Sequence, residues 1–336
     1  MVPKEYYGRL FTEDQLPTDY YSEASTLESM VKNDNQLRCK RCFSPIEEEW
    51  QLPNGKHYCR ACIVFGRNQE GKQLYYFASK EADINFPVLK WSGKLTSYQA
   101  EVSEKLLKTY QQQKNSLVHA VTGAGKTEMI YKIVAYVLET KGRVAIASPR
   151  VDVCRELHIR LQRDFTCSIS LLHAESEPYD GSPLVIATTH QLLKFYQSFD
   201  LIIVDEVDAF PFVGNPMLNH AVKQAKKKTG QLIYLTATST VSLEEQVRVG
   251  VLEKHHLARR FHGNPLVIPQ FFWQGKLQQS LSKQKLPRPL LRQLKKQRKS
   301  KFPLLIFFPN IAMGERFTKI LQNYFPEEKI AFVSSK

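Results

Sequence analysis

The chain has 336 residues, 43% of them hydrophobic and 24% charged, which is enough apolar material for more than one core and excludes a wholly disordered chain. No apolar run approaches the roughly 20 residues that a membrane-spanning helix needs, and the first residues lack the apolar stretch of a signal peptide. Lys and Arg outnumber Asp and Glu by 47 to 33, and the net charge of +14 suggests a polyanionic partner. We therefore expect a cytoplasmic protein.

The N-terminal part of the chain holds a cysteine-rich segment. Residues 1–36 are polar and mixed, so we expect an irregular arm, and residues 37–66 contain four of the six cysteines. These four form two Cys-x-x-Cys pairs: Cys39 and Cys42, Cys59 and Cys62. Two such turns can place four thiolates in a tetrahedron, so the spacing predicts a Zn²⁺ site. A reducing cytosol disfavours disulfides, and neither pair lies in the βαβ context of a redox motif.

Short apolar segments alternate with amphipathic ones from Leu95 to about Pro265, after a connector over residues 67–94. This alternation predicts an α/β fold with a parallel sheet covered on both faces. A helix is expected over residues 126–139, where apolar residues recur at helical spacing. Strands are expected at 116–121, 144–147, 169–172, 184–187, 201–204 and 232–235.

Residues 120–127 read AVTGAGKT, directly after an expected strand and at the start of an expected helix. That context is typical of a phosphate loop, whose backbone N–H groups surround the phosphates of ATP. Lys126 would contact the β- and γ-phosphates, and Thr127 would bind Mg²⁺. The first glycine of the general pattern is replaced by Ala120. The predicted nucleotide-binding residues are Ala120, Val121, Thr122, Gly123, Ala124, Gly125, Lys126 and Thr127.

A second acidic motif supports the same chemistry. Residues 201–208 read LIIVDEVD, so a buried strand would deliver Asp205 and Glu206 at its carboxyl end, where α/β folds bind ligands. Asp205 would bind Mg²⁺, and Glu206 would orient the attacking water. Lys126, Asp205 and Glu206 are therefore the predicted catalytic residues.

Further segments resemble the motifs of superfamily 2 helicases in their order along the chain. LTSYQ (95–99) is similar to the element in which a glutamine, here Gln99, reads adenine. SPRVDVCREL (148–157) and TTHQLL (188–193) resemble DNA-contact motifs, which implies that Ser148, Arg150, Thr188 and Thr189 bind DNA. LTATST (235–240) resembles the coupling motif, with Thr236, Ala237 and Thr238, and FFPNI (307–311) resembles the opening of a second motor domain. Trp91 is interpreted either as an adenine-stacking or as a core residue.

The zinc module placed before LTSYQ, the AVTGAGKT loop and the extended DEVDAFPF box together resemble the ComFA family of late competence proteins. The resemblance implies a RecA-like ATP-binding domain over 95–265. It also implies a DNA-dependent ATPase that moves single-stranded DNA during transformation. The implied partners are the membrane DNA-uptake channel and other competence proteins. The protein would then lie in the cytoplasm or peripherally at the membrane, and an oligomer is compatible with this function.

The last part of the chain is strongly basic. Residues 266–301 are expected to form a basic linker, and residues 302–336 the start of a second RecA-like domain with strands at 304–308 and 330–333. The basic stretch favours either a polyanion-binding segment or a solvated helix face, since leucines recur in it at helical spacing. With only the start of the second motor domain, the chain is expected to bind ATP but to hydrolyse it poorly.

Two alternatives to the competence motor remain from the sequence. One is a replication-restart helicase of the PriA type, which also combines zinc cysteines with such a motor but places them within its second domain. The other is a zinc-bearing DNA-binding or adaptor module that binds ATP without turning it over.

Overall fold

The computed structural model describes residues 1–33, 35–263 and 268–334. The chain forms two compact units, Met1–Leu266 (unit 1) and Val267–Lys336 (unit 2). Within the described residues, no helix is long and apolar enough to cross a membrane.

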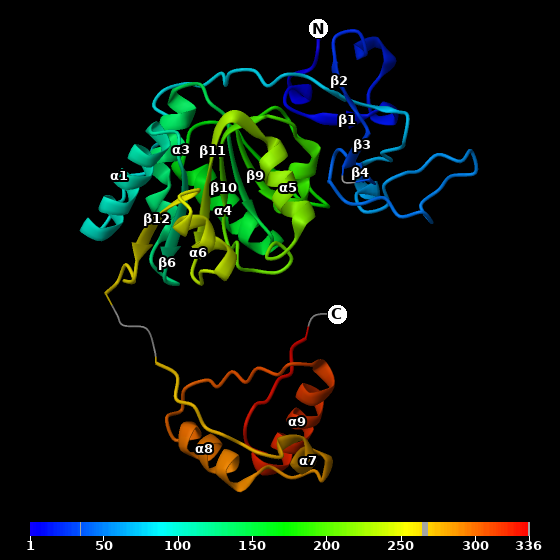
Figure 1. The fold of residues 1–336 in the computed structure, drawn as a ribbon. Coiled ribbons are helices and arrows are strands. Elements are labelled where there is room, and N and C mark those ends of the chain that lie inside the picture. The colour runs from blue at the N-terminus through cyan, green and yellow to red at the C-terminus, as the bar shows by residue number, and fades with distance from the viewer. Residues whose placement is uncertain (34, 264–267, 335–336) are drawn as a thin grey trace. The chain divides into compact units, whose positions relative to one another are not determined.

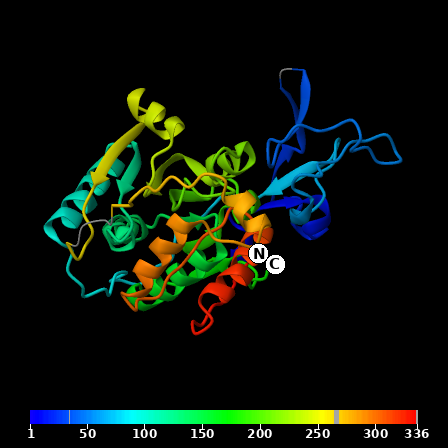
Figure 2. The ribbon, with the colours of Figure 1, turned by 90° about the horizontal axis from the view of Figure 1, so that it is seen from below.

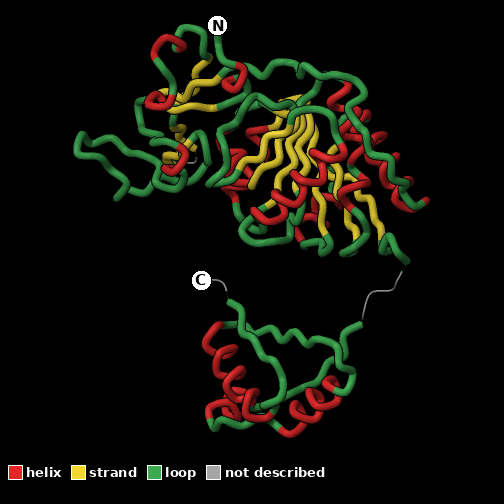
Figure 3. Tube along the Cα trace, turned by 180° about the vertical axis from the view of Figure 1, so that it is seen from behind, coloured by secondary structure: helices red, strands yellow, loops and turns green. Residues whose placement is uncertain are grey.

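A seven-stranded sheet, with the order β12-β6-β11-β10-β7-β9-β8, forms the centre of unit 1 (Figure 1). Every pairing in this sheet is parallel, and the strands form one twisted layer (Figure 3). The expectation of an α/β domain with a parallel sheet is confirmed. The strands are β6 Asn115–Ala120, β7 Val144–Ser148, β8 Ile169–Leu172, β9 Leu184–Thr188, β10 Phe199–Val204, β11 Lys226–Thr236 and β12 Leu252–Leu257.

Helices cover both faces of this sheet, and each face has its own buried core. Helices α1, α3 and α4 bury their apolar sides on one face, and α5 and α6 pack on the other together with the short 3₁₀ helix η5. The central strands are buried on both faces, which explains their continuous apolar sequences. The helices are α1 Ser97–Gln111, α2 Lys126–Met129, α3 Tyr131–Glu139, α4 Val151–Asp164, η5 Thr189–Lys194, α5 Pro216–Ala225 and α6 Val241–Arg248. The helix expected over residues 126–139 is thus interrupted at Ile130.

The expectation of an irregular arm over residues 1–36 is wrong. A three-stranded antiparallel sheet with the order β1-β5-β2 and a two-stranded ladder of β3 with β4 lie at the end of unit 1 opposite β12 (Figures 1 and 2). The middle strand β5 comes from the expected connector, so local composition does not reveal the pairing. The strands are β1 Leu10–Thr12, β2 Ser25–Glu28, β3 Met30–Asn33, β4 Gln36–Cys39 and β5 Gln73–Tyr76. Four short 3₁₀ helices accompany them: η1 Lys4–Tyr6, η2 Glu13–Gln15, η3 Thr18–Tyr20 and η4 Ile63–Phe65.

Unit 2 is helical where the structure describes it. Helices α7 (Leu277–Ser282), α8 (Arg288–Arg298) and α9 (Ile311–Tyr324) pack around a small core that includes Leu294 and Phe317. The expected basic linker therefore contains two helices whose leucines are buried or half-buried and whose lysines face solvent.

The strands expected at 304–308 and 330–333 are not formed within the described part of unit 2. The two segments instead line one hollow of about 740 Å³, and Leu305 and Phe307 stay largely exposed. A two-stranded pair is only marginally stable without neighbouring strands, which gives a physical reason why the apolar pattern alone was misleading.

Candidate nucleotide site and metal centre

The phosphate loop leaves β6 after Ala120 and enters α2 at Lys126. Gly123 and Gly125 adopt φ values of 78° and 73°, in the left-handed region that favours glycine. A Cβ atom at Gly125 would also lie 2.4 Å from Nε2 of Gln99, so a larger residue there would displace the Gln99 side chain. Ala120, by contrast, belongs to the buried end of β6 and has no positive φ, so the missing first glycine does not disturb the loop.

Gln99 connects the start of α1 to the phosphate loop. Its Oε1 accepts a hydrogen bond from the Thr96 N–H (2.9 Å), and its Nε2 donates to the Ala124 carbonyl oxygen (2.8 Å). Because an amide nitrogen carries two hydrogens, one N–H of Gln99 is left for a ligand. Its role in reading adenine therefore stays a prediction. The structure shows in addition that Gln99 holds the start of α1 to the phosphate loop.

The acidic motif follows β10 on the same edge of the sheet. Burial raises the pKa of the Asp205 carboxyl, and the positive charge of Lys126 lowers it, so the two predicted catalytic groups influence each other. Glu206 has φ of 54°, a left-handed value for a residue with a side chain, and donates its N–H to Asp205 Oδ1 (2.9 Å). Its Oε2 lies 3.8 Å from Nη1 of Arg150.

A cavity of about 650 Å³ joins these groups. Gln99, Asp205 and the loop residues from Gly123 to Thr127 all line it, and Trp91 and Phe261 line it as well. The Trp91 ring also packs edge-on against Tyr131 at 5.5 Å, so one face of this residue belongs to the core and another borders the cavity. Val121 and Thr122 lie in the loop outside this lining.

The predicted DNA-contact residues lie together, although three of them are buried. Ser148 and Thr188 are register partners at the carboxyl ends of β7 and β9, and Thr189 follows directly. All three side chains are buried, whereas the Arg150 side chain is 52% exposed and pairs with Asp152 (3.0 Å). Arg150 is thus the predicted DNA-contact side chain that a phosphate could reach without rearrangement.

The predicted coupling motif is hydrogen-bonded to the acidic motif. The Thr236 hydroxyl lies 2.7 Å from Asp208 Oδ1 and accepts the Thr238 N–H (3.0 Å). Ala237 lies between these two threonines at the end of β11. This arrangement joins the ends of β10 and β11, which are neighbours in the sheet.

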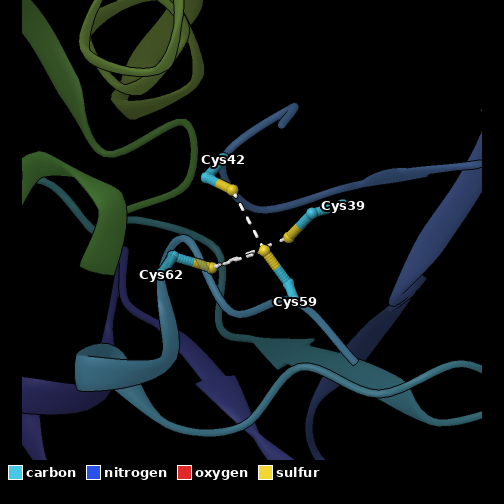
Figure 4. A group of neighbouring side chains, drawn as sticks. All are labelled: Cys39, Cys42, Cys59 and Cys62. Atoms are coloured by element: carbon cyan, nitrogen blue, oxygen red, sulfur yellow. Dashed lines mark hydrogen bonds between the residues drawn. The ribbon is translucent and has the colours of Figure 1, made fainter. Parts of the chain in front are cut away.

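The four cysteines of the predicted metal site point toward a common centre (Figure 4). Their sulfurs all lie within 4.8 Å of one another, for example 3.7 Å for Cys39–Cys62 and 3.5 Å for Cys42–Cys59. Tetrahedral Zn²⁺ with Zn–S bonds of about 2.3 Å requires sulfurs roughly 3.8 Å apart, whereas a disulfide requires about 2.05 Å. All four cysteines are free and fully buried, so the cluster fits Zn²⁺.

N–H groups surround these sulfurs. Arg41, only 1% exposed, donates from Nε and Nη2 to the Cys62 Sγ at 3.3 and 3.1 Å, and Asn68 donates from Nδ2 to the Cys39 Sγ at 3.1 Å. Such donors stabilise the negative charge of thiolate ligands. Arg41 lies between Cys39 and Cys42 in the sequence, but nothing in the sequence indicates its burial, and the position of Asn68 six residues after the last cysteine gives no signal.

The cysteine module shares one continuous core with the sheet domain. Buried residues from the cluster contact those of α5 and η5, and Phe43 stacks on His220 of α5 at 5.2 Å. Arg9 donates from Nε to the Lys194 carbonyl oxygen (3.2 Å), which ties the N-terminal sheet to η5. The module is therefore packed on the domain of the seven-stranded sheet rather than tethered to it.

Residues 92–241 match a family model described as Type III restriction enzyme, res subunit. The chain is 55% identical over 337 residues to the competence protein ComFA of Streptococcus pneumoniae, covering 99% of this chain and 77% of that protein. It is 34% identical over 315 residues to ComFA of Bacillus subtilis, covering 91% and 68%. The replication restart protein PriA of Bacillus subtilis is 25% identical over 171 residues, covering 46% of this chain and 21% of that protein.

The similarity to the two ComFA proteins spans nearly the whole chain, from the cysteine module through unit 2, whereas the similarity to PriA spans less than half of it. The order of motifs on one parallel sheet agrees with the helicase-type family model. The chain therefore belongs to the ComFA family of competence proteins, within the DEAD/DEAH helicase superfamily.

Proposed function

We propose that this chain is an ATP- and Mg²⁺-dependent motor that acts on single-stranded DNA during DNA uptake. The observation that carries the proposal is the cavity in which the phosphate loop, Gln99 and Asp205 meet. Its shape and donors suit a nucleoside triphosphate, and membership of the ComFA family supports the biological setting.

The phosphate loop and Asp205, which line the cavity, and Glu206, which lies outside its lining, have distinct roles in this proposal. The N–H groups of residues 122–127 and the ammonium of Lys126 bind the phosphates, while Thr127 and Asp205 hold Mg²⁺. Glu206 orients the attacking water. The raised pKa of Asp205 fits this assignment, because a bound divalent cation would stabilise the ionised carboxylate that burial destabilises.

The DNA track is proposed to run over the carboxyl ends of β7 and β9, where Ser148, Thr188 and Thr189 lie beside the exposed Arg150. Backbone phosphates would give affinity without sequence preference. The partners that follow are the membrane DNA-uptake channel and other competence proteins, with the protein working at the cytoplasmic face of the membrane.

Zn²⁺ is proposed as the resident ion of the cysteine cluster, because four buried thiols with N–H donors match its ligand preference. There it would hold the cysteine module together and take no part in phosphoryl transfer.

A second candidate is a DNA-binding module that holds ATP without turning it over. It is favoured by unit 2, since none of the described residues 268–334 belongs to a strand. A motor of this class uses an arginine from its second domain, which contributes about 10³–10⁵ in rate. In this candidate, ATP is bound but turned over slowly, because no such arginine reaches the γ-phosphate.

Turnover measured with and without single-stranded DNA, beside Lys126→Ala as a blank, tests both candidates. DNA-stimulated turnover that disappears in Lys126→Ala would support the complete motor. Binding with turnover at the level of the blank would support the second candidate. No binding of ATP would refute both.

A further inference from the structure

A short segment after β12, residues 258–263, lies beside the phosphate loop; we call it the strap. β12 and β6 are parallel, and Leu257 pairs with Ala120 at their carboxyl ends. The segments that follow the two strands therefore begin side by side at the same edge of the sheet. The Val121 N–H donates to the Leu257 carbonyl oxygen (3.2 Å), and the Phe261 N–H donates to the Gly123 carbonyl oxygen (3.1 Å). The phosphate loop is thereby bonded to the end of β12 at Leu257 and to the strap at Phe261.

Arg260 of the strap extends along this loop. Its Cγ and Cδ lie 3.8 Å from the position that a Cβ of Gly123 would occupy, so its aliphatic part covers the glycine. Its Nε is buried and has no hydrogen-bond partner among the described residues. The neighbouring Arg259 differs, because its guanidinium lies over the Tyr98 ring (5.2 Å) and Nη1 donates to the Tyr98 hydroxyl (3.3 Å).

The other arginines around the nucleotide cavity are already paired. Arg160 forms ion pairs with Glu128 and Glu156, and Arg163 forms one with Asp164. Arg260 lines an adjoining pocket of about 300 Å³, which shares Gln99 and Phe261 with the nucleotide cavity. Within the described part of the chain, neither Arg260 nor the exposed Lys94, which lines the nucleotide cavity, has a carboxylate partner. An unpaired guanidinium held against a phosphate loop is suited to a polyphosphate, which it can bind with two N–H groups.

We propose that Arg260 is a nucleotide-binding residue, whose guanidinium binds the phosphates of a nucleoside di- or triphosphate from the strap side. Phosphate binding would neutralise the unpaired charge and fix the strap over Gly123. The inference rests on the proposed function, because it concerns a ligand of the nucleotide cavity, and it adds a phosphate contact from the adjoining pocket, outside the phosphate loop and the acidic motif.

The test measures the affinities of ATP, ADP and AMP by competition with a fluorescent ATP analogue, using the full chain. Arg260→Gln should weaken ATP and ADP by roughly tenfold to a hundredfold, since a hydrogen bond to a charged group contributes about 1.5–3 kcal/mol. AMP should be affected least. Arg260→Lys should restore part of the loss because it keeps the charge, and Arg259→Gln, the matched control, should change affinity less than about threefold.

Unchanged ATP affinity in Arg260→Gln would overturn the proposal. Equal losses in the Gln and Lys variants would also overturn it, because shape rather than charge would then be responsible. The unfolding temperature of the ligand-free variant, compared with wild type, separates a folding defect from a binding defect, and a large decrease counts against the proposal. If the wild-type chain bound no nucleotide, the proposed function itself would fail, which is distinguishable from the failure of Arg260 alone.

Discussion

The cysteine cluster and the nucleotide cavity belong to the same unit. They differ in how many of their polar and charged groups already have partners within the protein. The cluster is closed: its four cysteines are fully buried, and the sulfurs of Cys62 and Cys39 accept N–H bonds from Arg41 and Asn68. The nucleotide cavity is an open space of about 650 Å³ with a half-buried lysine and a destabilised carboxylate. A closed site makes its ion part of the fold, whereas an open site with unsatisfied charge is suited to a ligand that enters and leaves.

The largest expected effect is on the closed site. Replacing Cys39 and Cys42 by Ser should release the metal and strongly lower the unfolding temperature, because structural zinc contributes about 10–16 kcal/mol of apparent binding free energy. Metal content by atomic spectroscopy and thermal unfolding check this. The control is Cys154→Ser, a buried cysteine outside the cluster that donates to the Ala187 carbonyl oxygen (3.2 Å). Purified wild-type protein with no zinc, or with iron instead, would refute the assignment.

At the nucleotide cavity, we expect a substitution to reduce ligand affinity without reducing the stability of the fold. Lys126→Ala should weaken ATP–Mg²⁺ by roughly 30- to 150-fold, from about 2–3 kcal/mol of lost charged hydrogen bonding, with unfolding changed by less than about 0.5 kcal/mol. Calorimetric titration measures the affinity. Lys132→Ala, which removes a surface lysine paired with Glu104, is the control and should bind ATP normally. If Lys126→Ala unfolded the protein as well as preventing ATP binding, the contrast between the nucleotide cavity and the cysteine cluster would be wrong.

A smaller effect tests the connection between the ends of β10 and β11. Thr236→Val keeps the shape of the side chain but removes its bond to Asp208, at a cost of about 1–2 kcal/mol in stability. ATP affinity should stay within about threefold, while any stimulation of turnover by DNA should fall. Denaturant unfolding and turnover assays measure the two quantities. Full stimulation in the variant would argue against a coupling role for this threonine.

The smallest effect concerns unit 2. Changing the exposed Lys295, Lys296 and Lys299 to Gln should weaken binding to all single-stranded DNA sequences alike. Each lost phosphate contact should reduce the slope of log affinity against log salt by about 0.7. Arg298 is left unchanged because it pairs with Glu328. As a control, changing Lys72, Lys105 and Lys132, each paired with a carboxylate, should leave the slope unchanged. An unchanged slope in the first variant would mean that this surface is only a solvated helix face.

The features that could best be predicted from the sequence are those specified by residues adjacent in the chain. AVTGAGKT and the two Cys-x-x-Cys pairs specify their own local geometry, so the loop conformation and the four-sulfur cluster were both expected. The six strands expected in the motor domain also form, because burial on both faces of a parallel sheet imposes continuous apolar runs.

Features whose geometry depends on residues far away in the chain could not be predicted from the sequence. β12 has the mixed sequence LEKHHL and was not expected, since its partner β6 lies more than 130 residues earlier in the chain. The strap and Arg260 therefore could not be placed beside Gly123 in advance. The burial of Ser148 and Thr189 likewise depends on how neighbouring strands pack, which a motif does not record. In unit 2, the apolar pattern at 304–308 predicted a strand that is not formed in the described structure.

The shared core of the cysteine module and the motor sheet has a mechanical consequence. Phe212, which lies between the acidic motif and α5, belongs to the same buried cluster as the four cysteines. Close-packed interiors transmit strain rather than absorb it. A force applied to the cysteine module would therefore be transmitted to the segment that carries Asp205 and Glu206. The module would be rigidly coupled to that segment and would not move independently of it.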